Sequence, residues 1–443
     1  MEIPDCFRGG SGVTREPAGG DRATASLPLF ARLLNAARFS RSIAQGVLAA
    51  DFVLYLRSLH WSGGEIGAVL AMSLVFSVFL TVAAGIPSDR YGRKPFVLAY
   101  DGLYVLACLA AIVSKSHGVL AAAAIVGGFG RGANGVAGPF GDIEKAWITQ
   151  SPNARTWSHA LNLNSTLGFL GMALGCASAA LPGLFPRDAG GGLDYQLVFP
   201  IALTAAMVSF CCLAIAEDRH AEIVDAVPGR NEPEMRRLEN RNLRRLSSVN
   251  MLNGMGIGLV GPLTSYWFAA KFGVGPKHIG PMMAAGFLLA AFSAHISAAF
   301  TVRFGLIPVI VGQRGAAVLA LLALPFTSSL GAATTMYLLF NTLNRASNGP
   351  RATMTAALVR NRRRGLAGTI SSVSRQIPQS LGPVLAGLMY DAGLFATPFL
   401  AAAAFHAGYL YLYYRHFGEH DPLRTEAKSA TPWNPEPAYD PKN

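Results

Sequence analysis

Charged residues are scarce in this chain. Asp, Glu, Lys and Arg make up 14% of its 443 residues, whereas 51% are apolar. A soluble globular domain usually has about 25% charged residues, so this chain carries too little charge to cover a surface that faces water. The composition therefore predicts an integral membrane protein, with lipid as much of its solvent.

The sequence also lacks the residue clusters that redox, metal or catalytic chemistry would need. The five cysteines form no C-x-x-C pair, and the nine histidines show no spacing typical of metal ligands. One G-x-G-x-x-A motif, at 128–133, resembles a dinucleotide fingerprint, but it lies inside an apolar run and follows no soluble strand. We therefore expect no metal, no cofactor and no enzyme activity.

Twelve stretches are long and apolar enough to cross a bilayer, which takes about 20 residues in a helix. They lie near 37–58, 65–86, 95–113, 118–139, 159–182, 196–216, 248–270, 278–300, 306–326, 330–350, 366–388 and 394–415. The predicted fold is an all-α membrane protein with an N-terminal six-helix bundle at 31–216, a linker at 217–247, a C-terminal six-helix bundle at 248–416, and disordered tails at 1–30 and 417–443. The first tail has no apolar stretch, so we expect no cleavable signal peptide.

The formal net charge of +12 does not indicate nucleic-acid binding, because the basic residues occupy short segments between the apolar runs. The segments that connect the spans form two alternating sets. One set, which includes the linker, contains most of the arginines. This asymmetry predicts that both termini and the linker are cytoplasmic. We expect a multi-pass protein of the cell membrane that contacts lipid, does not bind nucleic acid and is a monomer.

The two halves contain the same landmarks at a nearly constant offset. The pattern R-x-x-N-G occurs at 131–135 and again at 345–349, a shift of 345 − 131 = 214. The pair Ile66-Gly67 recurs as Ile279-Gly280, at 280 − 67 = 213. Collinear matches over some seventy residues indicate two six-helix repeats, and in such transporter folds substrates bind near the bilayer midplane between the repeats.

The segment Gly85-Ile86-Pro87-Ser88-Asp89-Arg90-Tyr91-Gly92-Arg93-Lys94 resembles the signature loop of the major facilitator superfamily, G-x-x-x-D-R-x-G-R-K. The resemblance covers residues 30–418 and implies a secondary transporter. It also implies that this loop latches the outward-facing arrangement. The expected latch residues are Gly85, Asp89, Arg90, Gly92, Arg93 and Lys94.

Arg131 is similar to the arginine of a second motif of the family, R-x-x-Q-G, with Asn134 in place of glutamine. In the family this arginine is tied to proton coupling. A buried arginine keeps its proton and must find an acceptor. A third motif, G-x-x-x-G-P of antiporters, is present only as Gly171 and Gly175, because Cys176 replaces the proline.

Charged residues inside predicted spans are candidate functional residues, because burying them in a membrane is costly. We expect Asp51 to carry the proton opposite Arg131, with Asp101 as the alternative carrier. If helices one, four, seven and ten line the cavity, as the resemblance implies, the substrate-cavity candidates are Asn250, Asn253, Asn341 and Arg345. With Asp51 and Arg131 counted among the lining residues, two arginines stand against one carboxylate, which favours an anionic or zwitterionic substrate.

The sequence therefore predicts an ion-coupled carrier of a small organic solute that uses protons and exports its substrate. Uptake of an organic anion or nutrient by symport is the alternative on the same fold. A non-transporting membrane receptor or a membrane-embedded enzyme is a third interpretation, which no catalytic cluster in the sequence supports.

Overall fold

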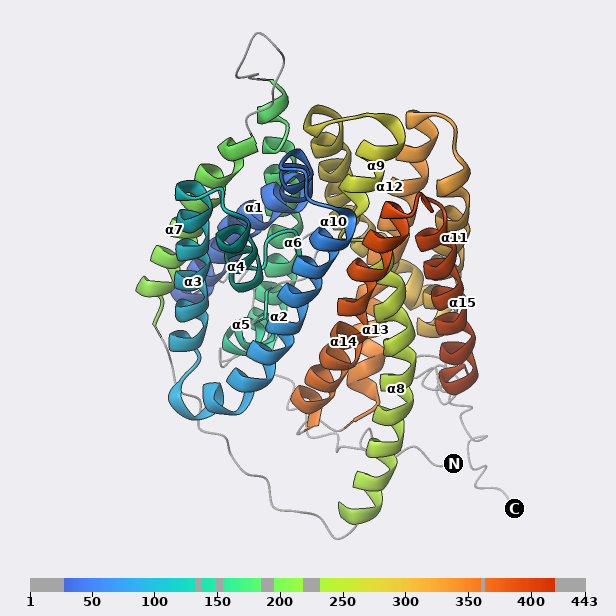
Figure 1. Cartoon of the computed structure of the whole chain (residues 1–443). Helices are drawn as coiled ribbons and strands as arrows, with labels where there is room; N and C mark the ends of the chain where they lie inside the picture. Colours follow the sequence, from blue (N-terminus) through green and yellow to red (C-terminus); the bar gives the residue numbers. More distant parts are fainter. Residues whose placement is uncertain are drawn as a thin grey trace, which may run out of the picture.

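The computed structural model describes residues 28–131, 138–139, 141–148, 154–184, 195–217, 232–359 and 363–418. These residues form α-helices joined by short connections and three single turns of 3₁₀ helix (Figure 1). In chain order the helices are α1 (Leu29–Ser58), α2 (Gly63–Tyr91), α3 (Lys94–Val113), α4 (His117–Gly127), α5 (Gly141–Ile148), α6 (Ala154–Ser178), α7 (Val198–Ile215), α8 (Glu232–Val260), α9 (Thr264–Phe272), α10 (Pro276–Phe304), α11 (Leu306–Ala323), α12 (Leu330–Ala346), α13 (Asn348–Ala357), α14 (Arg364–Asp391) and α15 (Thr397–Phe417).

Two of the twelve predicted spans are each divided into two helices, and α5 lies between the predicted spans 118–139 and 159–182, which together account for the fifteen helices in the described residues. Between α4 and α5, Gly128 and Gly130 adopt left-handed backbone angles (φ 76° and 73°), which glycine allows and a regular helix does not. Pro262 follows the end of α8, and Pro350 lies in the first turn of α13, where its missing N–H does not matter. The predicted all-α fold with twelve spans is confirmed.

Large apolar side chains on the outer faces of several helices are exposed, among them Phe79 of α2, Leu106 of α3, Phe292 of α10 and Leu319 of α11. Six of the described helical segments have the length and composition to cross a membrane by themselves. Apolar surface of this extent is unfavourable in water and is expected where a protein faces lipid. The structure thus agrees with the membrane assignment drawn from the low charge content.

Two ends of the bundle serve as reference points. We call the end at which α2 begins the hairpin end, after the short α1–α2 connection at 59–62, and the end at which α8 begins the linker end. In Figure 1 the hairpin end is at the top and the first turn of α8 at the bottom. Helix α8 begins at Glu232, so it includes part of the segment 217–247 that the sequence analysis assigns to the linker.

Glycines bring helices into backbone contact within each half. A Cβ atom on Gly46 of α1 would overlap the carbonyl oxygen of Met172 in α6, and one on Gly175 would overlap that of Ile43. In the second half, a Cβ on Gly258 of α8 would overlap the backbone of α14 at Gln379. Since 258 − 46 = 212, the two crossings occupy equivalent places in the repeats.

The two halves meet at the hairpin end through the repeated Ile-Gly pair. A Cβ on Gly67 of α2 would overlap the carbonyl oxygen of Pro383 in α14, and one on Gly280 of α10 would lie 2.6 Å from that of Cys176 in α6. The carboxylate of Asp391, at the end of α14, also accepts the backbone N–H groups of Gly63 and Gly64 at the start of α2, each at 2.7 Å. The hairpin end is therefore closed, and α2 and α14 diverge from it toward the linker end (Figure 1).

Candidate functional site

A cavity of about 340 Å³ lies between the two halves. Its lining includes Thr81, Gly138, Pro139 and Gly141 from the first half, all of them uncharged. The second half contributes residues of α8, α9, α12, α13, α14 and α15, among them several amides and hydroxyls. Cavities of about 300–1,000 Å³ hold small organic ligands, so this one is large enough for a compact solute.

Three of the residues predicted to line the cavity do so. These are Asn250 of α8 and Asn341 and Arg345 of α12. The fourth, Asn253, is fully buried, and its side-chain oxygen accepts a hydrogen bond from Arg314 of α11.

The charges on the described cavity wall are all positive. Arg345, Arg351 of α13 and Arg375 of α14 line it, and no Asp or Glu occurs among the described lining residues. The guanidinium carbon of Arg345 lies 3.9 Å from the ring centroid of Phe287, a distance at which the ring face stabilises a cation. The wall therefore attracts negative charge from the side of the second half.

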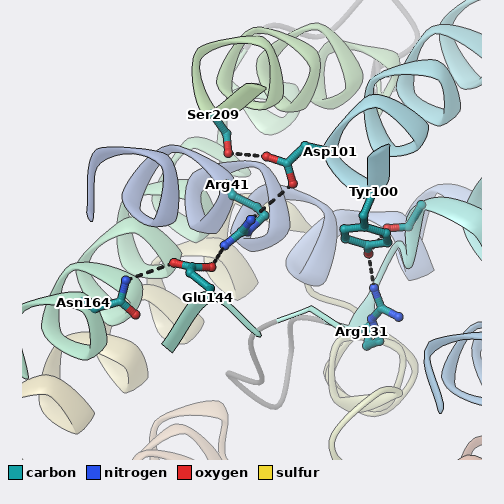
Figure 2. Close-up of polar contacts among 8 residues, drawn as sticks. Arg41, Tyr100, Asp101, Arg131, Glu144, Asn164 and Ser209 are labelled. Atoms are coloured by element: carbon teal, nitrogen blue, oxygen red, sulfur yellow. Dashed lines mark hydrogen bonds and ion pairs between the residues drawn. The ribbon is translucent and has the colours of Figure 1, made fainter. Parts of the chain in front are cut away.

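A buried network of charges joins five helices of the first half (Figure 2). Arg41 of α1 donates to Asp101 of α3 at 3.2 Å and also to Glu144 of α5. Ser209 of α7 donates to the other oxygen of Asp101 at 2.5 Å, and Asn164 of α6 donates to Glu144 at 3.0 Å. Each carboxylate is 2% exposed, so both ion pairs are removed from water.

Arg38, one turn before Arg41 on α1, adds a second cation next to this network. Its guanidinium lies against Gly168 of α6 and interacts electrostatically with Glu144. Two arginines then face two carboxylates, which balances the formal charge. Loss of charge on either carboxylate would leave a buried positive charge without its partner, which is costly.

Arg131 and Asp51, the predicted proton-coupling pair, have different surroundings. Arg131 donates to the hydroxyl of Tyr100, which in turn donates to the carbonyl of Gly127 at 3.2 Å. Asp51 is fully buried near the hairpin end of α1, and within the described part of the chain neither of its oxygens has a hydrogen-bond partner. Electrostatic contact links it to Cys176 of α6 and to Tyr195.

The predicted latch loop connects α2 and α3 at the linker end. Gly92 takes a left-handed angle (φ 90°), and the ammonium of Lys94 donates to the carbonyls of Ala214 (2.6 Å) and Ala216 (2.8 Å) at the end of α7. Arg93 occupies the position just before α3 and makes no side-chain capping hydrogen bond there. Gly85 lies within α2, the side chains of Asp89 and Arg90 lie outside the described part, and so do Asn134 and Gly135.

Sequence reasoning missed the roles of Arg41 and Glu144 in the buried network and of Arg351 in the cavity wall. Arg41 lies within the first predicted span, and Glu144 and Arg351 lie between predicted spans. One signal could have pointed to Arg41. It is related to Asn253 by 253 − 41 = 212, just as Asp101 is related to Arg314 by 314 − 101 = 213, so the two pairs occupy matching places in the repeats.

Comparison with known proteins identifies the family. A family model described as the Major Facilitator Superfamily matches residues 34–235 and 246–438. The chain belongs to the major facilitator superfamily. No curated protein sequence matches the chain.

Several solved structures of transporters resemble this member of the superfamily. The nucleoside transporter NupG superposes with a TM-score of 0.68 at 13% identity, covering 88% of this chain and 100% of that one. A D-xylose-proton symporter gives 0.66 at 13%, covering 85% and 97%. A bacterial homologue of the human lysosomal transporter Spinster, inward-facing and unoccupied, gives 0.66 at 14%, covering 92% and 98%.

Identities this low show a shared fold and do not transfer a substrate. Family membership and the fold together identify a multi-pass membrane transporter and not an enzyme. This confirms the resemblance drawn from the signature loop and the repeats. The solute, the coupling ion and the direction of transport have to be argued from the site itself.

Proposed function

We propose that the chain is a proton-coupled carrier that moves a small organic solute by alternating access. The observation that carries this proposal is the position of Arg41, buried between the carboxylates of Asp101 and Glu144. Arginine keeps its proton, whereas a carboxylate can gain one. The network is thus a buried group of fixed positive charge whose negative partners can be neutralised one proton at a time.

The network lies close to the cavity along the chain, so proton binding to the network can affect the solute site. Glu144 lies on α5, three residues after Gly141, which lines the cavity. Protonation of Glu144 would weaken its ion pair with Arg41 and free α5 to shift against α1. Asp51 is a second proton site in this proposal, because a fully buried carboxylate without a described partner is costly to hold in its charged form.

Alternating access needs a closed end that can open. At the hairpin end, Gly67 and Gly280 bring helix backbones of the two halves close together, and Asp391 binds the start of α2. Helix packing of this kind can separate as a rigid-body motion of one half against the other. We propose, as the family resemblance implies, that the latch loop stabilises the state in which the linker end is closed.

We propose export as the direction, by exchange of solute for protons. Its support is the position of Gly171 and Gly175, which stand at the two glycine positions of the antiporter motif, although Cys176 replaces the proline of that motif. Both bring α6 into backbone contact with α1, the helix that carries Arg41. The sign of coupling can be measured directly.

The test uses purified protein in liposomes that contain a pH-sensitive dye. Each of a set of sugars, nucleosides and organic anions is added outside under a clamped membrane potential. Antiport raises the pH of the lumen as solute enters, whereas symport lowers it, irrespective of protein orientation. We expect a rise for at least one compound, and Glu144→Gln should abolish it while solute–solute exchange persists.

The same liposome experiment is repeated with Asp51→Asn. Its matched control is Glu65→Gln, at an exposed position in the first turn of α2. We expect Asp51→Asn to reduce proton movement and the control to retain it. A fall in lumen pH would replace export with uptake by symport. Solute entry without any change of pH in the parent protein would refute proton coupling.

A further inference from the structure

The cavity wall contains three arginines, of which Arg345 is buried and Arg351 and Arg375 are partly buried. Arg345, Arg351 and Arg375 come from α12, α13 and α14, three consecutive helices of the second half. The lining described from the first half has only the neutral residues Thr81, Gly138, Pro139 and Gly141. Three like charges around one small space repel one another, and the repulsion is stronger there than in water because the dielectric constant is lower.

We propose that the substrate is a compact organic anion with at least two negative charges, held by these three arginines. The inference rests on the proposed transport function and adds the class of solute. Guanidinium groups bind planar or tetrahedral oxyanions through paired hydrogen bonds, so carboxylate and phosphate groups fit this wall equally well. A neutral sugar or nucleoside would bring no negative charge to these arginines.

The remaining wall is suited to the uncharged part of such a solute. Asn344 of α12 has a buried side-chain oxygen with no hydrogen-bond partner among the described residues, and it can accept from a solute hydroxyl. Asn250 instead donates to Ser371 at 2.9 Å, and Asn341 donates to the carbonyl of Tyr337 at 3.1 Å. Phe340 provides an apolar contact. The volume of about 340 Å³ restricts the solute to a small molecule.

Binding to the purified protein tests this inference without any proton flux. The panel holds succinate and glutarate as dicarboxylates, glucose 6-phosphate as a phosphorylated sugar, benzoate as a monoanion, and glucose and uridine as neutral solutes. Dimethyl succinate supplies the shape of succinate without its charge. The rise in unfolding temperature and the dissociation constant from calorimetry are measured for each at one ionic strength.

We expect a dianion to bind and its neutral ester not to bind. Arg351→Gln and Arg375→Gln should each weaken binding about 10- to 100-fold, the range expected for one hydrogen bond to a charged group. Arg345→Gln tests the third position, although its stacking on Phe287 makes this variant the one most sensitive to misfolding. Arg415→Gln, on an exposed position of α15, is the matched control and should bind as the parent does.

The outcomes separate this inference from the proposed function. A neutral solute that binds equally well to the parent and to both glutamine variants would overturn the anion assignment, even if that solute moves protons. A dianion that binds through the arginines but moves no protons would support the assignment and contradict proton coupling. Dicarboxylates and the sugar phosphate are compared with each other to decide which oxyanion the wall prefers.

Discussion

Each half of the molecule buries one arginine within a repeat-related pair of positions, and the two arginines have different partners. In the first half Arg41 of α1 pairs with Asp101 of α3, whereas in the second half Arg314 of α11 donates to Asn253 of α8. Cation and acceptor have exchanged helices between the repeats. The acceptor is a carboxylate in the first half and an amide in the second.

This difference in acceptors determines which half can change its charge by binding protons. In the first half the described carboxylates of the network can bind protons. In the second half, the buried carboxylate among the described residues is Glu239, close to the linker end and paired with Arg363 at 2.8 Å. The cavity arginines Arg345, Arg351 and Arg375 keep their charge at any physiological pH. The comparison supports proton binding by the first half and anion binding by the second half.

The largest effect is expected from making the first half resemble the second. Asp101→Asn replaces the titratable acceptor of Arg41 with the amide found at the equivalent pair. One proton moved across one pH unit can support about tenfold accumulation of solute. We expect the accumulation ratio of the variant under an imposed pH gradient to fall to about one, with solute–solute exchange retained.

Asn253→Asp is the reciprocal change and serves as the control. It gives Arg314 a carboxylate partner but leaves Arg41, Asp101 and Glu144 intact, so accumulation should be similar to that of the parent. Both are measured as radiolabelled solute taken up by liposomes. If Asp101→Asn accumulates solute as well as the parent, Glu144 or Asp51 carries the proton and the comparison of the halves loses its functional meaning.

The pattern of apolar runs was sufficient to predict the twelve spans and the repeats, because membrane helices need about 20 apolar residues each. The family resemblance implies that helices one, four, seven and ten line the cavity. This was enough to predict Asn250, Asn341 and Arg345 as lining residues. The network around Arg41 was not found. Ion pairs across helices depend on which faces meet, and a linear pattern does not contain that information, especially for Glu144, which lies between two predicted spans.

An intermediate effect is expected at the helix crossings, where the halves should behave alike. Gly46→Ala and Gly258→Ala each introduce a methyl group where another helix backbone lies. Overpacking of this kind costs about 1–3 kcal/mol. We expect both variants to have a lower unfolding temperature in detergent, by similar amounts.

Gly315→Ala provides the control for these two variants. It lies in the middle of α11 with no atoms close to an added Cβ, so alanine should be neutral or stabilising there. A destabilised control would show that any glycine replacement harms the fold. A large difference between Gly46→Ala and Gly258→Ala would show that the two crossings are not equivalent.

The smallest effect is expected where the two contacts between the halves differ. At the hairpin end, the α2–α14 contact has the carboxylate of Asp391 bound to two backbone N–H groups. At the related α6–α10 contact, the groups that lie close to Gly280 are backbone atoms of Cys176 in α6 and of Ala179 and Ala180 just after it. Asp391 is exposed, so its hydrogen bonds at the start of α2 contribute about 1 kcal/mol, as helix N-caps do.

Asp391→Ala should therefore shift the equilibrium toward opening of the hairpin end by about fivefold. Cys176 is a natural probe, because it is buried in α6 beside Gly280 and becomes accessible when this end opens. In a protein with Cys176 as its single cysteine, we expect a small maleimide to react about fivefold faster after Asp391→Ala. Cys108, buried inside the first half, is the matched probe and should react at an unchanged rate. Faster reaction at both cysteines would indicate general loosening, and an unchanged rate at Cys176 would show that the backbone contacts of Gly67 and Gly280 close this end without the carboxylate.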